Sequence, residues 1–252
     1  MHEGIPLLEF DSERTAVLEP GHGLFGSTGT LPERAVLCFY AEILATLPAD
    51  ARQIGQLEAV HGTHPVWCLR RGGEDIAVLH PGMGAPLAAF FLECAIAMGA
   101  RKVVACGGCA SLTDVGAGEI VVPDAAVRDE GTSYHYLPAS REVAADAVGV
   151  RTAEAVLTER GVVHRRGKVW TTDGLFRETR SRIARRREEG CLVVDMEAAA
   201  FFAVARFRGI RFAQLLYGGD DIGGPEWEHR DWTTSPSRAL TFDLALEVAS
   251  RL

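Results

Sequence analysis

The chain has 252 residues, a formal net charge of -8 at pH 7, and a composition that is 47% hydrophobic and 24% charged. These values are typical of a globular protein with a sizeable core, and they exclude a largely disordered chain. The negative charge argues against a nucleic-acid or anionic-membrane partner, and no apolar stretch reaches the roughly 18 to 20 residues that a membrane-spanning helix needs.

In the first third of the chain, a short strand is predicted at 15–18, before a glycine-rich loop at 25–31. Residues 32–47 are predicted to form a helix, with Pro32 in its first turn. Two apolar runs, 66–69 and 76–80, flank Arg71-Gly72-Gly73-Glu74-Asp75, and this pattern predicts a β-hairpin.

The middle of the chain alternates between predicted helices and strands. The helices are expected at 87–98, 143–160 and 181–189, and the strands at 102–105, 119–122 and 167–172. The first of these strands runs into Cys106-Gly107-Gly108-Cys109-Ala110-Ser111, which is predicted to be a turn. Residues 128–136 are polar and aromatic, and their role is left open.

In the last third, a short apolar run at 191–194 leads into Asp195, Met196 and Glu197. A helix is predicted at 198–208, with Gly209 as its C-terminal glycine. The next strand, at 212–217, leads into Gly218-Gly219-Asp220-Asp221. An acidic, tryptophan-bearing loop and a terminal helix at 236–252 complete the chain.

This alternation predicts an α/β fold, in which one three-layer αβα domain spans residues 1–252 around a mixed, mostly parallel sheet. No linker or internal repeat divides the chain. Glycine-rich or polar turns follow almost every strand, so they are expected to meet at one edge of the sheet. Ligands of open α/β sheets bind at the carboxyl ends of the strands.

Each acidic cluster has two interpretations. Glu197 at the start of a helix is either a carboxylate favoured by the helix dipole or one that accepts both hydroxyls of a ribose diol. Asp220 and Asp221 either form a turn or supply one pocket carboxyl, because adjacent side chains point in different directions. A pocket aspartate with a raised pKa can share a proton with a ring nitrogen as a glycosidic bond breaks.

The six cysteines lie in apolar segments, and the N-terminus lacks the features of a signal peptide, so reduced, buried thiols in a cytoplasmic protein are expected. The spacing of Cys106 and Cys109 suits a metal or redox site, but no second Cys or His pair has ligand spacing. No metal and no cofactor are therefore expected. Backbone N–H groups at Gly107 and Gly108 could instead face an anion or a ribose oxygen.

Val194-Asp195-Met196-Glu197-Ala198-Ala199-Ala200 resembles a motif of the purine and uridine nucleoside phosphorylase superfamily, which includes hydrolases such as methylthioadenosine nucleosidase. Other family segments are matched in order. Similar segments lie at 16–21 (AVLEPG), 80–86 (HPGMGAP), 102–112, 121–124 and 216–222. The resemblance spans roughly residues 12–250 and implies the fold predicted above.

The resemblance also implies roles for individual residues. Met196 and Glu197 would bind the ribose, and Asp221 would protonate or hydrogen-bond the base, with Asp220 beside it where the family has serine. Phe176 would stack on the base. The implied activity is cleavage of the N-glycosidic bond of a purine or pyrimidine nucleoside by a homo-oligomeric enzyme.

The phosphate side departs from the family pattern. Family phosphorylases bind phosphate with arginines, yet none follows Gly21-His22, and position 105 is alanine. Gly21, His22, Gly108 and Ser111 are the remaining candidate phosphate ligands. Phosphate is the expected co-substrate, and two alternatives stay open: a hydrolase that uses water, and a nucleoside-binding protein without turnover.

Overall fold

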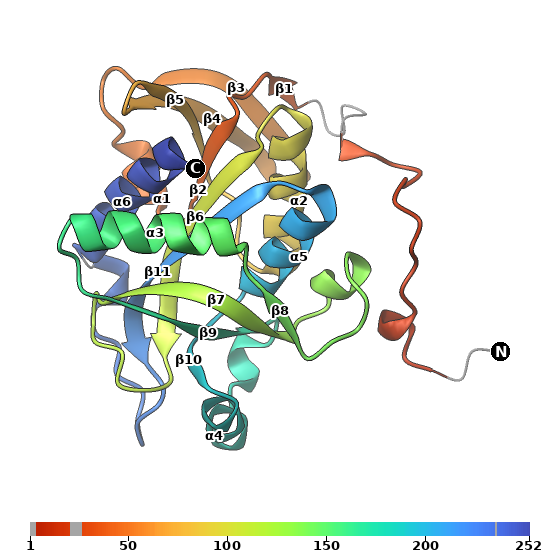
Figure 1. The fold of residues 1–252 in the computed structure, drawn as a ribbon, viewed down its shortest axis with the longest axis vertical. Coiled ribbons are helices and arrows are strands. Elements are labelled where there is room, and N and C mark those ends of the chain that lie inside the picture. The colour runs from red at the N-terminus through yellow and green to blue at the C-terminus, as the bar shows by residue number, and fades with distance from the viewer. Residues whose placement is uncertain (1–3, 21–26, 235) are drawn as a thin grey trace.

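The computed structural model describes residues 4–20, 27–234 and 236–252, in which helices cover both faces of a mixed β-sheet (Figure 1). The strands are β1 Thr28–Gly29, β2 Arg34–Cys38, β3 Arg52–Ala59, β4 Gly62–Arg71, β5 Glu74–Leu79, β6 Lys102–Ser111, β7 Ile120–Asp129, β8 Glu142–Ala144, β9 His164–Thr172, β10 Cys191–Asp195 and β11 Arg211–Asp221. The α-helices are α1 Ala41–Ala45, α2 Ala85–Ala97, α3 Ala147–Glu159, α4 Arg180–Glu188, α5 Ala198–Arg208 and α6 Ser237–Arg251. The 3₁₀ turns are η1 Pro6–Leu8, η4 Thr132–His135, η5 Leu175–Arg177 and η6 Trp232–Thr234.

Strand β6 organises the sheet. It pairs in parallel with β2 on one side and with β11 on the other, and its last two residues pair antiparallel with β10. Beyond β2 the sheet continues through β5, β4, β3 and β1. Beyond β10 it continues through β9 and β7, and β7 returns to β11. The strands β6, β10, β9, β7 and β11 therefore close into a ring beside the open part of the sheet.

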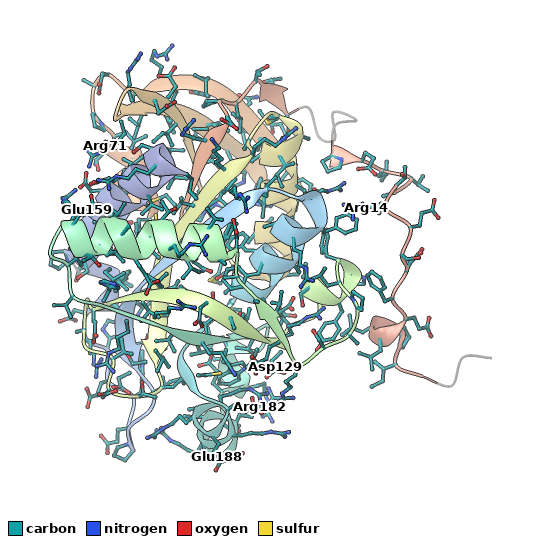
Figure 2. All side chains as sticks on the ribbon, in the orientation of Figure 1. Arg14, Arg71, Asp129, Glu159, Arg182 and Glu188 are labelled. Atoms are coloured by element: carbon teal, nitrogen blue, oxygen red, sulfur yellow. The ribbon has the colours of Figure 1, made fainter. Side chains whose placement is uncertain are left out.

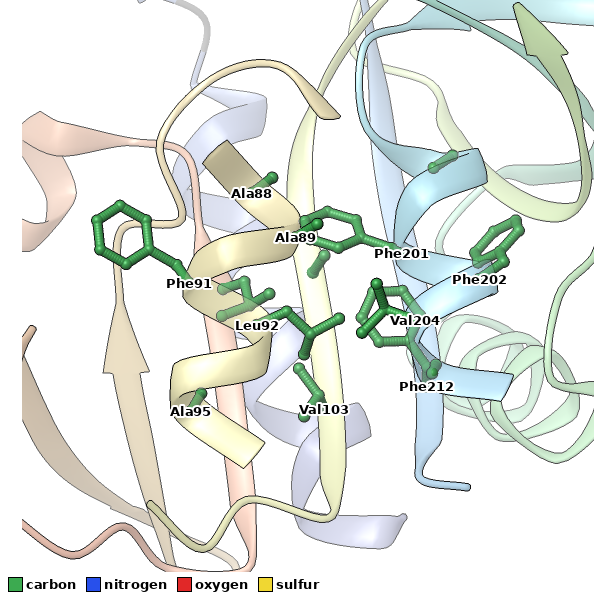
Figure 3. Packing of buried hydrophobic residues seen from close by; sticks show 14 of the residues in the cluster. Ala88, Ala89, Phe91, Leu92, Ala95, Val103, Phe201, Phe202, Val204 and Phe212 are labelled. Carbon is green, nitrogen blue, oxygen red and sulfur yellow. The ribbon is translucent and has the colours of Figure 1, made fainter. Parts of the chain in front are cut away.

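On one face of the sheet, α2 and α5 pack against each other and against the strands. Alanines such as Ala88, Ala89 and Ala95 let the helices approach closely, while Phe201 and Phe212 fill the space beneath (Figure 3). Helix α5 has the predicted bounds, and Gly209 ends it in the left-handed conformation at φ 69°. This packing fixes the start of α5 relative to the ends of the strands.

Helices α3 and α6 cover the opposite face (Figure 1). Gly149 lies in α3 where a Cβ would come within 2.0 Å of the Phe212 carbonyl oxygen in β11. Glycine is unfavourable inside a helix, but at this position it allows α3 to contact the strand.

Several sequence predictions hold, and others fail for identifiable reasons. The hairpin is confirmed, since Arg71 pairs with Glu74 across Gly72 and Gly73, which both have positive φ as a two-residue turn requires. Residues 32–47 form β2 and then the short helix α1, because Val36 and its neighbours are buried between β5 and β6. Here tertiary burial overrides the local helix signal.

Two further predictions need correction, and one strand of the structure was not predicted. Residues 15–18 form no strand, and β3 at Arg52–Ala59 carried no signal that we read. Residues 106–111 continue β6 instead of forming a turn. Glycine is needed there for packing, because a Cβ on Gly107 would lie 3.2 Å from the Phe39 ring, and one on Gly108 would lie 3.2 Å from the Tyr217 ring.

The cysteine prediction is confirmed. All six thiols are free and buried. In the part of the chain that the structure describes, no helix is long and apolar enough to cross a membrane.

Candidate functional site

A cavity of about 490 Å³ opens where β2, β5, β10 and β11 end and where β6 passes beneath them. This volume is in the range of small-molecule sites. The residues that line it include Phe39, His80, Met196, Glu197, Gln214 and Asp220. A larger cavity of about 740 Å³ lies between residues 11–20 and helices α2 and α5, and none of the predicted site residues that the structure describes lines it.

Asp195, at the end of β10, caps the start of α5. Its carboxylate accepts hydrogen bonds from the Thr171 hydroxyl at 2.8 Å, the Ala198 N–H at 2.9 Å and the Gln214 amide at 3.3 Å. The Ala198 bond satisfies one of the free N–H groups at the start of α5. Three donors stabilise the ionised form of Asp195, although burial raises its pKa to about 6.

Glu197 is therefore free to face the cavity. It occupies the N-cap position of α5 without a side-chain capping bond, and it is buried. Its Oε1 accepts a hydrogen bond from the Gly84 N–H at 2.6 Å. Burial, and next the negative charge of Asp195, raise the pKa of Glu197 to about 8. The raised pKa favours the protonated form of Glu197 near neutral pH.

Met196 lies beside Glu197 in the cavity wall, as the Met-Glu motif predicts. The loop between β5 and α2, which includes Met83 and Gly84, closes over the same region. The structure thus brings together the 80–86 and 194–200 segments, which are distant in sequence.

At the end of β11, the structure brings Asp220, and not Asp221, to the cavity. Gly218 pairs with Cys109 and Asp221 with Ser111, so Gly219 and Asp220 together face a single residue of β6. This extra residue is a β-bulge, which redirects the side chains that follow it. Asp221 instead accepts a hydrogen bond from the Gly223 N–H at 2.7 Å and pairs with Arg230.

Asp220 has a defined partner of its own. Its Oδ2 accepts a hydrogen bond from the Trp227 indole N–H at 2.7 Å. Trp227 belongs to the loop between β11 and η6, and Trp232 of the same region lines the cavity. The acidic, tryptophan-bearing loop of the sequence therefore forms one wall of the site.

The loop after β9 contributes different residues from those predicted. Phe176 is 96% exposed and does not line the cavity. Leu175 and Glu178, on either side of it, do line the cavity. They are three residues apart around the 3₁₀ turn η5, and residues at this spacing share a face.

The two predicted phosphate ligands that the structure describes, Gly108 and Ser111, differ in their position relative to the cavity. Gly21 and His22 lie outside the described residues. Gly108 lies in β6 against the Tyr217 ring and lines the cavity. Ser111 is buried and donates its hydroxyl to the Val115 carbonyl at 3.0 Å, and it does not line the cavity.

Among the described residues that line the cavity, Arg238 is the one side chain with a fixed positive charge. It lies over the Tyr40 ring, pairs with Glu42 at 3.1 Å and donates to the Thr233 carbonyl. His80 lines the cavity too, but burial lowers its pKa, and its Nδ1 accepts a hydrogen bond from Gly82. The imidazole is therefore neutral at neutral pH.

Residues 128–136, whose role was left open, have a structural one. The Arg128 guanidinium donates to the Ser133 hydroxyl, to the Pro138 carbonyl and to the Ser140 hydroxyl, each at 2.7 to 2.8 Å. It also lies 4.1 Å from the centre of the Tyr134 ring. This arginine pins the loop between β7 and β8.

Comparison with known proteins supplies independent information. A family model described as the phosphorylase superfamily matches residues 22–249. The guanosine phosphorylase of Halorubrum lacusprofundi is 27% identical over 164 residues, which is 65% of this chain and 68% of that protein.

Two solved structures show the same fold. The uridine phosphorylase of Vibrio fischeri ES114 has a TM-score of 0.74 at 20% identity, over 93% of this chain and 95% of that one. The AMP nucleosidase of Bacteroides thetaiotaomicron has a TM-score of 0.71 at 20% identity, over 88% of both chains. The predicted α/β architecture, with helices on both faces of a mixed central sheet, is thereby confirmed.

Proposed function

The chain belongs to the phosphorylase superfamily, and from this premise we propose that it cleaves the N-glycosidic bond of a nucleoside. The observation that carries the proposal is the buried Glu197, which makes no side-chain capping bond, beside Met196 in a cavity that Asp220 also lines. A carboxylate at a helix start can accept two neighbouring hydroxyls, and ribose presents such a pair. The relatives named above are a guanosine phosphorylase and a uridine phosphorylase.

In this proposal Glu197 binds the ribose hydroxyls and Met196 packs against the sugar. Hydrogen bonds donated by the sugar favour the ionised carboxylate, so nucleoside binding lowers the pKa of Glu197 from about 8. Asp220 faces the base. The breaking bond then lies between these two carboxyl groups, and no cofactor is needed.

Phosphate is the acceptor that the names of the relatives suggest, but the cavity favours water. Arg238, the fixed cation in the described part of the cavity wall, is already paired with Glu42. Beside Ala105, the Gln214 side chain of β11 lines the cavity while its Oε1 is buried without a hydrogen-bond partner. A carbonyl oxygen repels phosphate oxygens but accepts a hydrogen bond from water. The AMP nucleosidase among the structural neighbours is consistent with a hydrolytic member.

The test is to incubate the protein with guanosine, inosine, adenosine and uridine, with and without phosphate, and to measure release of the base. Base release that is independent of phosphate, with free ribose as the second product, is the expected result. Release that requires phosphate and yields ribose 1-phosphate would establish the phosphorylase instead. Saturable nucleoside binding without any product would contradict both and indicate a binding protein.

A further inference from the structure

The leaving base needs a proton, because the neutral base is a far better leaving group than its anion. The sequence assigned this role to Asp221, whose carboxylate is instead occupied by Arg230 and the Gly223 N–H. We propose that Glu178 is the general acid that protonates the base, an inference that rests on the function proposed above. Sequence reasoning passed over this residue.

Glu178 has the position that the role requires. It follows η5 and lines the same end of the cavity as Asp220 and Leu175. The neighbouring Thr179 caps α4 by accepting from the Arg182 N–H, so Glu178 is not needed as a cap. In the described part of the chain, its half-buried carboxyl group has no hydrogen-bond or ion-pair partner.

The two carboxyl groups at this end of the cavity are not equivalent. Asp220 accepts the Trp227 indole N–H at 2.7 Å, so a donor of the protein already occupies one of its oxygens. Glu178 has no such donor, and its burial and the negative charge of Asp220 raise its pKa to about 7. The proton shared by such a pair therefore resides on Glu178, which can donate it, while Asp220 accepts a hydrogen bond from the base.

No cation in the described structure reverses this assignment. Arg180, on the adjoining helix, donates to the backbone carbonyls of Ile222, Gly224 and Pro225 and not to Glu178. In the described part of the chain, the titratable and charged groups that line the cavity are His80, Cys109, Glu178, Asp195, Glu197, Asp220 and Arg238. Of these, Asp220 is the one whose charge acts appreciably on Glu178.

The proposed step balances. The bond between C1′ and the base nitrogen breaks, and its electron pair stays with the base. The Glu178 carboxyl proton moves to a ring nitrogen of the base, which leaves a carboxylate on Glu178. The acceptor oxygen forms the new bond to C1′ and releases its own proton to solvent, from which Glu178 is protonated again.

The experiment compares Glu178→Gln with wild-type protein on the four nucleosides and on 4-nitrophenyl β-D-ribofuranoside, whose phenolate leaves without a proton. Positioned acids contribute roughly 100-fold to 10,000-fold. We expect kcat for a nucleoside to fall about 100-fold or more, with the rate on the phenyl riboside changed less than about threefold. Glu188→Gln is the control, since Glu188 is exposed at the outer side of α4 (Figure 2).

A second measurement needs no variant. Because Glu178 must be protonated, kcat of the wild-type protein on nucleosides should fall as pH rises above about 7, whereas kcat on the phenyl riboside should not fall. Three outcomes would overturn this inference and leave the proposed function standing. They are a kcat of the wild-type protein that falls above about pH 7 on both substrates, a Glu178→Gln variant with the kcat of wild type on nucleosides, and a Glu178→Gln variant whose kcat falls equally on both substrates. A wild-type protein that cleaves none of these compounds would overturn the proposed function, and this inference with it.

Discussion

Replacing Glu197 by glutamine should stabilise the protein while abolishing its activity. The buried carboxyl group accepts a hydrogen bond from the Gly84 N–H, and it faces the negative charge of Asp195. Glutamine has the same shape, keeps an oxygen that accepts from Gly84, and carries no charge. A residue positioned for a ligand and not for the fold should behave in this way.

The magnitude follows from the pKa of Glu197, which rises from 4.5 to about 8 on folding. Between these values the folded protein holds a proton that the unfolded chain has lost, so stability falls as pH rises through this window. The slope for one such group is about 1.4 kcal/mol per pH unit. Because the slope falls to half as the pH reaches the folded pKa, the advantage of Glu197→Gln over wild type should grow by about 2 kcal/mol between about pH 6 and pH 8.

The assay is denaturant unfolding of both proteins across that pH range, with Glu188→Gln as the matched control. The difference in the free energy of unfolding between Glu188→Gln and wild type should not change with pH, because Glu188 is exposed. A Glu197→Gln variant that is destabilised equally at all pH values would refute the reasoning. That outcome would mean that Glu197 is ionised and paired in the folded protein.

Two further substitutions test the packing of α3 and the separation of the two aspartates. Gly149→Ala should destabilise the protein by on the order of 2 kcal/mol, because its Cβ would lie 2.0 Å from the Phe212 carbonyl oxygen. The measurement is denaturant unfolding, and a free energy of unfolding equal to that of wild type would show that α3 can shift. Asp221→Asn should lose the Arg230 ion pair, so its melting temperature should fall while kcat/KM is reduced only a few-fold. Asp220→Asn should lower kcat/KM about 100-fold, because Asp220 lines the cavity. A larger loss of kcat/KM in Asp221→Asn than in Asp220→Asn would restore the catalytic role predicted for Asp221.

Local signals in the sequence predicted the structure correctly where a backbone conformation requires one type of residue. Gly209 ends α5 because it adopts a positive φ, and Gly72 with Gly73 makes the hairpin turn for the same reason. The Met-Glu motif likewise placed Met196 and Glu197 at the start of a helix that follows a strand.

Local signals failed where long-range pairing decides. Val36 and its neighbours have a composition that also suits a helix, and only burial between β5 and β6 makes them a strand. Sequence reasoning also read Gly107 and Gly108 as a turn for an anion, because the Phe39 and Tyr217 rings that need the space come from other strands.

The sequence by itself determined the kind of fold and the acidic groups at the ends of the strands. Only the tertiary structure decided which of these groups face the cavity. The bulge opposite Ala110 brings Asp220 inward and directs Asp221 to Arg230, and the turn η5 brings Glu178 inward while Phe176 points to solvent. The physical reason is that one extra residue in a strand, or one step around a turn, reverses the direction of a side chain, and neither leaves a mark in composition or periodicity.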